Sequence, residues 1–136
     1  PKQTQSAYAD EKQQDEQTVD GSVTFQGIKY SLEKQSDGKT AVVRTSDSGT
    51  KSVLFEVEGT PTSLILFNGT ILVPENRESG WDVVACALVD GSLPTLIADK
   101  DGKTVGGNGT ITATTLDGTT LKVTDSTGNT TSVALQ

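Results

Sequence analysis

From Gly21 onward, short runs of apolar residues alternate with clusters of Gly, Asn, Asp and Ser. In some of these runs, such as Phe55-Glu56-Val57-Glu58, apolar and polar residues alternate, as in a strand whose side chains point to alternate faces. Such runs, bounded by turn residues, are typical of strands joined by tight reversals. The pattern predicts an all-β fold with antiparallel strands.

Turn residues mark where the chain should reverse. Asn68-Gly69 separates two apolar runs, and Asn-Gly is the strongest short hairpin signal because a type I′ turn needs positive φ at both central residues. Second hairpins are predicted over residues 41–57, 83–97 and 121–135, each around a turn that contains Gly and Ser together with Asp or Asn.

The reversals recur along the chain. Gly27, Gly69 and Gly109 are 42 and 40 residues apart, and a period in this range indicates a repeat architecture. We therefore expect residues 21–136 to form a single domain of three tandem, four-stranded repeats of about 40 residues.

Three architectures fit such repeats. Four-stranded units of this length are blades of β-propellers, which typically close with four to eight copies, so three would make a partial propeller. A β-trefoil closes with three units. A β-sandwich is the remaining alternative.

Residues 1–20 differ from the rest of the chain, because they are almost entirely polar and contain five acidic and two basic residues. A segment with so little apolar surface cannot offset the entropy cost of ordering. It is interpreted as a polar, acidic tail or linker, although helix propensity leaves a short helix over residues 7–17 open.

Residues 81–97, with the turn Asp90-Gly91-Ser92, and the preceding run at residues 67–72 resemble the blade repeats of bacterial TolB-like β-propellers, best over residues 64–97. The resemblance implies a protein-binding or sensory role at the cell envelope and supplies no catalytic residue. We accordingly expect an extracytoplasmic location, secreted or anchored at the cell surface, for example as a lipoprotein whose leader has been removed.

The formal charge of −7 and the lack of any basic cluster make nucleic acid an unexpected partner. No apolar run approaches the roughly 20 residues that span a bilayer, so the domain itself should not insert into a membrane. The expected partner is a protein or glycan at the envelope, and a homo-oligomer remains open.

Residues with catalytic potential are few. The absence of histidine removes the Ser-His-Asp and Cys-His arrangements and the commonest zinc ligand, and no cofactor is expected. Asp99 and Asp101 resemble the start of a calcium loop, but a hydrated turn is the favoured interpretation. Glu56 and Glu58 should share a solvated strand face, and Cys86 should be buried in an apolar strand.

These patterns favour a noncatalytic binding or scaffold module over an enzyme. We place the contact surface at Trp81 and the loop over residues 76–80, with Asn76, Arg77 and Glu78 as binding residues and no catalytic or metal-binding residue. For Trp81, core packing competes with an exposed role in sugar stacking or partner binding. The alternative functions are a carbohydrate-binding domain and a carboxylate-based hydrolase, which would need a concave pocket with one neutral acid.

Overall fold

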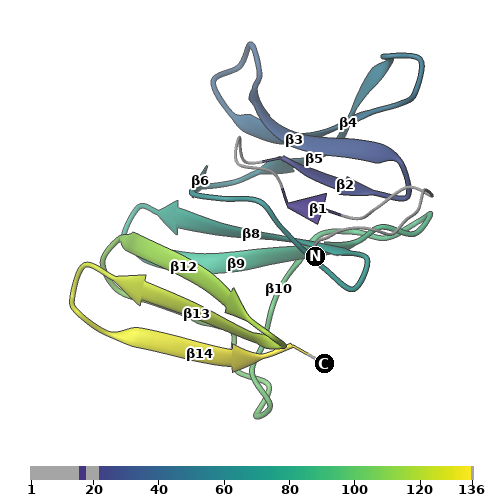
Figure 1. Cartoon of the computed structure of the whole chain (residues 1–136). Coiled ribbons are helices and arrows are strands. Elements are labelled where there is room, and N and C mark those ends of the chain that lie inside the picture. The colour runs from purple at the N-terminus through teal and green to yellow at the C-terminus, as the bar shows by residue number, and fades with distance from the viewer. Residues whose placement is uncertain (1–15, 18–21, 136) are drawn as a thin grey trace.

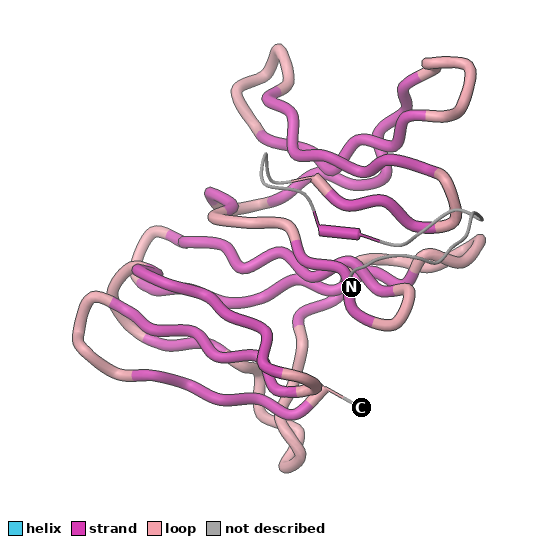
Figure 2. Tube along the Cα trace, viewed as in Figure 1, coloured by secondary structure: helices cyan, strands magenta, loops and turns pink. Residues whose placement is uncertain are grey.

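The computed structural model describes residues 16–17 and 22–135, and all of its regular structure is β-strand (Figures 1 and 2). Over these residues there is no helix, and hence none that could cross a membrane. All of the strand pairs are antiparallel, which confirms the predicted class. Of the tail expected over residues 1–20, only Glu16–Gln17 are described, and the rest lies outside the described residues.

The strands form three sheets that follow one another along the chain. The first sheet has the order β1 (Glu16–Gln17), β2 (Val23–Phe25), β3 (Ile28–Lys34), β4 (Thr40–Thr45) and β5 (Lys51–Val57). The central sheet contains β6 (Thr60–Pro61), β7 (Ile65–Phe67), β8 (Thr70–Arg77), β9 (Gly80–Ala87), β10 (Thr95–Leu96) and β11 (Gly106–Gly107). The third sheet contains β12 (Ile111–Asp117), β13 (Thr120–Asp125) and β14 (Thr130–Ala134).

The central hairpin β8–β9 lies between the other two sheets (Figure 1). Its two faces contribute to two separate hydrophobic cores, because successive side chains of a strand point to opposite faces. The core shared with the first sheet receives Ile71, Val73, Val84 and Cys86, and the core shared with the third sheet receives Leu72, Trp81 and Val83. This double burial explains why residues 71–73 and 83–86 are continuously apolar instead of alternating.

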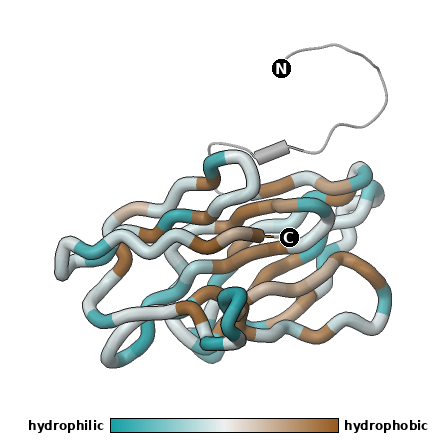
Figure 3. Tube along the Cα trace, turned by 90° about the horizontal axis from the view of Figure 1, so that it is seen from below, coloured by the Kyte–Doolittle hydropathy of each residue, from teal (hydrophilic) through white to brown (hydrophobic). Residues whose placement is uncertain are grey.

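Hydrophilic residues gather in the turns at the ends of the strands, as the teal segments of Figure 3 show. The turns Gln26-Gly27 and Asn68-Gly69 close the hairpins β2–β3 and β7–β8, and all four residues have positive φ, as a type I′ turn requires. The predicted hairpin at residues 64–73 is therefore confirmed. Pairing of β4 with β5, β9 with β10 and β13 with β14 confirms the three second hairpins.

The third glycine of the predicted repeat has different surroundings. Gly109 follows β11, which pairs with β9 of the central sheet and not with β12. Here the chain crosses between sheets, and Gly107 lies so close to Trp81 that a Cβ at this position would meet Nε1 at 2.9 Å. Over the described residues the sheets contain five, six and three strands, where the glycine spacing predicts four in each.

Two hydrogen bonds from the turn end of the central hairpin hold the third sheet. The Asn76 Oδ1 atom accepts from the backbone N–H of Ile111 at 2.8 Å, and the indole N–H of Trp81 donates to Asp125 Oδ2 at 3.3 Å. Asp125 also accepts from the hydroxyl and the backbone N–H of Thr127, and the hydroxyl contact is the main reason that the pKa of Asp125 is lowered. Charge-assisted bonds of this kind are stronger than neutral ones.

We predict that the Trp81–Asp125 contact couples the two sheets energetically. Trp81→Phe keeps most of the ring but removes the donor, and should lower the free energy of unfolding by about 1–3 kcal/mol. In a double-mutant cycle with Asp125→Ala, measured by urea unfolding, the two changes should be non-additive by about 1 kcal/mol. Additive losses would show that the hydrogen bond does not form.

Candidate functional site

A groove lies where the first sheet meets the central sheet, on the side of the Glu78-Ser79 turn. It consists of two hollows of about 580 and 360 Å³, which have Glu58 and Arg77 as common lining residues. We call these the polar hollow and the acidic hollow, and the two together the seam groove. The chain passes from the first sheet to the central sheet here, through Glu58 and Gly59 between β5 and β6.

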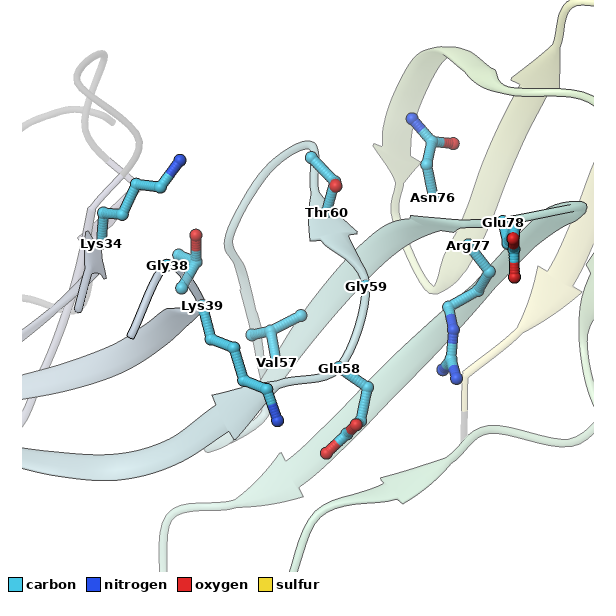
Figure 4. Close-up of a pocket in the computed structure, with 11 residues that line it drawn as sticks. Lys34, Gly38, Lys39, Val57, Glu58, Gly59, Thr60, Asn76, Arg77 and Glu78 are labelled. Atoms are coloured by element: carbon cyan, nitrogen blue, oxygen red, sulfur yellow. The ribbon is translucent and has the colours of Figure 1, made fainter. Parts of the chain in front are cut away.

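The polar hollow has charged side chains on opposite walls (Figure 4). One wall carries Lys34, at the end of β3, and Lys39, at the end of the turn before β4. The other wall carries Asn76 and Arg77, at the end of β8, and Glu78 in the turn that follows. Glu58 lies between the two walls (Figure 4). The hollow therefore offers cations on one wall and charges of both signs on the other.

The acidic hollow combines carboxylates with apolar side chains. Its lining residues are Glu56, Glu58, Glu75, Arg77, Val84, Pro94, Thr95 and Leu96. The segment that supplies Pro94 and Leu96 also carries Val89 and Leu93, which at 68% and 77% are the two most exposed large apolar side chains of the described residues, while Leu96 is 45% exposed. Of these three side chains, Leu96 lines the hollow. Exposed apolar side chains with a polar rim are a feature of partner-binding surfaces.

Two carboxyl groups, Glu75 and Asp82, lie beneath the groove at directly paired positions of β8 and β9. Glu75 Oε1 accepts from the backbone N–H of Gly59 at 2.8 Å, and Oε2 accepts from Arg77 at 3.1 Å. Arg77 also lies 3.5 Å from Asp82 Oδ2. The side chain of Glu75 is fully buried and that of Asp82 is 14% exposed. We call these two residues the carboxyl pair.

The electrostatics of the carboxyl pair favour one retained proton. Burial, followed by the hydrogen bond and the negative charge of Glu75, raises the pKa of Asp82 to about 7, while Arg77 opposes this shift. The pKa of Arg77 is itself raised, chiefly by its hydrogen bond to Glu75. At neutral pH the Arg77 guanidinium thus lies beside two carboxyl groups, and that of Asp82 is partly protonated.

The predicted binding residues divide into two groups. Asn76, Arg77 and Glu78 all line the polar hollow, although Asn76 and Arg77 belong to β8 and not to a loop. The Asn76 amide oxygen itself is bonded to Ile111 of the third sheet. Trp81 does not, because it is only 3% exposed and packs in the core between the central and third sheets. Trp81 therefore packs in the core, which is the alternative to an exposed role that the sequence left open, and its burial gives no support to its placement in a contact surface.

Sequence reasoning missed four residues of the site. Lys34, at the end of β3, and Lys39, in the turn before β4, line the groove only because the sheets pack together, which no local pattern reveals. Glu75 and Asp82 could have been identified from the sequence, because each interrupts or borders an otherwise apolar run. A carboxyl group inside a buried strand needs a partner.

Other candidate residues have structural roles. Asp99 Oδ1 accepts the backbone N–H groups of Asp101 and Lys103, as expected for the hydrated turn. Glu56 and Glu58 are both exposed, whereas Phe55 is buried, as predicted from the alternation. Cys86 is buried in the core, and burial raises the pKa of its thiol. Within residues 16–17 and 22–135, no group of acidic, cysteine or histidine side chains is arranged to hold a metal ion.

Comparison with known proteins gives no match to a protein-family model, to a curated protein or to a solved structure. The geometry of the seam groove is therefore the basis for the proposals that follow.

The carboxyl pair predicts a pH-dependent stability. The folded-state pKa of Asp82, about 7, lies above its ordinary value of 3.8, so between these values the folded protein binds more protons than the unfolded chain. This contribution is complete below pH 3.8 and is lost as pH rises through 7. From pH 5 to 8 the free energy of unfolding should fall by on the order of 1–2 kcal/mol, reduced by the partial solvent contact of Asp82.

Urea unfolding at pH 5, 6, 7 and 8 measures this effect. Asp82→Asn should flatten the decline, because an amide holds the neutral form at every pH. The matched control is Glu56→Gln, which neutralises an exposed carboxylate of the same groove and should leave the slope unchanged. Equal slopes for the wild type and Asp82→Asn would contradict the assignment.

Proposed function

We propose that this chain is a noncatalytic binding module of the bacterial cell surface, and that the seam groove takes an extended segment of a partner protein. The observation that carries the proposal is the groove itself, which combines lysines at one end with carboxylates and exposed apolar side chains at the other. The resemblance of residues 64–97 to TolB-like blades supports a role in protein binding outside the cytoplasm.

The charges of the groove define the chemistry of the partner segment. Lys34 and Lys39 favour an acidic side chain in the polar hollow, whereas Glu56 and Glu58 favour a basic side chain beside the acidic hollow. Pro94 and Leu96 favour aliphatic groups between them. A protein segment supplies all three kinds of side chain. Trp81, the candidate sugar-stacking side chain, is buried and so gives the carbohydrate-binding alternative no support.

A random dodecapeptide library displayed on phage tests this proposal. Selected peptides should carry acidic residues at one end and aliphatic and basic residues at the other. Reversing the charge of both groove lysines, with Lys34→Glu and Lys39→Glu, should weaken peptide binding at least tenfold when affinity is measured by calorimetry. Leu96→Ser should weaken binding about threefold or more.

The matched control is Lys100→Glu with Lys103→Glu, which makes the same charge change in an exposed turn that does not line the groove. Affinity should be nearly unchanged in this variant. Binding that is weakened equally by both pairs of substitutions would reflect net charge alone and would contradict the proposal.

The carboxyl pair specifically favours a second candidate, a carboxylate-based hydrolase. A concave site and a carboxyl group titrating near pH 7 are the two features that such an enzyme requires. We rank it below the binding module because Glu75 is fully buried and both of its oxygens already accept hydrogen bonds, which leaves it poorly placed to reach a substrate.

We further infer that the three sheets are arranged as a partial propeller, in preference to a β-trefoil or a β-sandwich. Propeller sheets pack face to face in succession. The central sheet here has a core on each of its faces, which supports that arrangement.

The outer face of the third sheet leads to a prediction for the state of the chain in solution. Thr115, Lys122 and Ser132 are neighbours across this sheet, on the face opposite its core residues. A polar terminal face can end a stack in water, as capping repeats do. We therefore expect a monomer of about 14.2 kDa in sedimentation equilibrium at micromolar concentration. A stable dimer or trimer would mean that another blade continues the stack.

A further inference from the structure

One oxygen atom of the carboxyl pair lacks a hydrogen-bond donor. Both oxygens of Glu75 have donors, and Asp82 Oδ2 lies near Arg77. Asp82 Oδ1 is buried and has no donor. Leaving a buried acceptor unpaired destabilises the folded state. A proton shared between the two carboxyl groups removes this cost, because the protonated acid then donates to the other.

The carboxyl pair is also connected to the crossover between the sheets. Gly59, which donates to Glu75, lies so close to β8 that an added Cβ would be 2.4 Å from the Asn76 carbonyl oxygen and 2.8 Å from Arg77 Cδ. The connection therefore rests directly on β8 and on the Arg77 side chain. Since Arg77 and Glu58 line both hollows, movement of Arg77 changes the whole groove.

We propose that the carboxyl pair is a proton-dependent latch that sets the shape of the seam groove. With one proton shared, Glu75 holds Gly59 and Arg77 in the arrangement described above. When that proton leaves, two adjacent negative charges repel each other, Asp82 turns toward solvent and draws Arg77 with it, and the bond between Glu75 and Gly59 weakens. Its consequence for ligand binding rests on the proposed function of the groove.

The surrounding charges set the pH at which the latch operates. From the central sheet the pair faces Arg77, and from the end of β5 and the crossover Glu56 and Glu58 line the adjoining acidic hollow. Lys34 and Lys39 lie farther away, across the polar hollow. Arg77 favours loss of the proton, whereas burial and the adjacent Glu75 favour its retention. The pKa of Asp82, about 7, indicates that the pair changes state near neutral pH.

The Gly59 amide provides a test that needs no ligand. In nitrogen-15 NMR spectra from pH 5.5 to 8.5, its signal should shift with a midpoint near 7, and its hydrogen exchange, corrected for the intrinsic pH dependence, should become at least tenfold faster above that midpoint. In Asp82→Asn the signal should stay at its low-pH position, because the amide donates to Glu75 permanently. Glu75→Gln serves the same purpose if Asp82→Asn does not fold.

Glu58→Gln is the matched control, because it removes an exposed carboxylate next to Gly59 but leaves the pair intact. Its Gly59 signal should still titrate near pH 7. A Gly59 signal that does not move in the wild type, or that titrates equally in Asp82→Asn, overturns the latch.

Binding at two pH values tests the connection to function. A phage-selected peptide that binds at pH 6 should bind the wild type about tenfold more weakly at pH 8, while Asp82→Asn should bind equally at both. Equal wild-type affinity at pH 6 and 8 overturns the control of the groove. If no peptide binds at either pH, the proposed function fails, and the Gly59 titration still decides whether the latch exists.

Discussion

Burial of the β8–β9 hairpin on both faces is the constraint on which the rest of the structure depends. An antiparallel sheet usually keeps one face in water, but this hairpin carries apolar side chains on both faces and so requires a sheet on each side. Fully burying side chains such as Ile71, Val73 and Val83 contributes about 1.5–3 kcal/mol each. The first and third sheets are therefore held mainly by what they cover on the central one.

The side chains of the β8–β9 hairpin change from apolar to polar along its length, and the groove lies at the polar end. Away from the Glu78-Ser79 turn its side chains are apolar, whereas next to that turn Glu75 and Asp82 face the first sheet, and Asn76 faces the third. Buried polar groups need partners, so each face forms specific hydrogen bonds to the neighbouring sheet at this end. The third sheet satisfies Asn76 through the Ile111 N–H, whereas on the other face the carboxyl pair receives the Gly59 N–H from the crossover after β5, and the seam groove lies beside it.

The strands and their turns could be predicted because they depend on local chemistry. Asn68-Gly69 specifies a type I′ turn by itself, and the alternation of Phe55 and Glu56 fixes which face of β5 is buried. The sheet boundaries could not be predicted from spacing, because Gly109 follows a crossover and not a hairpin. Trp81 was ambiguous for a related reason, since an aromatic residue at the start of a strand packs inward or outward according to which sheet covers it.

The groove could not be predicted from the sequence because it joins residues from two sheets, but three of its lining residues could be singled out for a physical reason. Asn76, Arg77 and Glu78 stand out as charged and amide groups at the end of an apolar strand, where the chain must return to solvent. The opposite wall has no such signal, because Lys34 and Lys39 resemble any lysines beside a turn. Glu75 is the informative exception. A carboxylate that follows four apolar or proline residues in one strand cannot be solvated there, so its position alone implies a buried partner, and in this fold that partner includes a second acid.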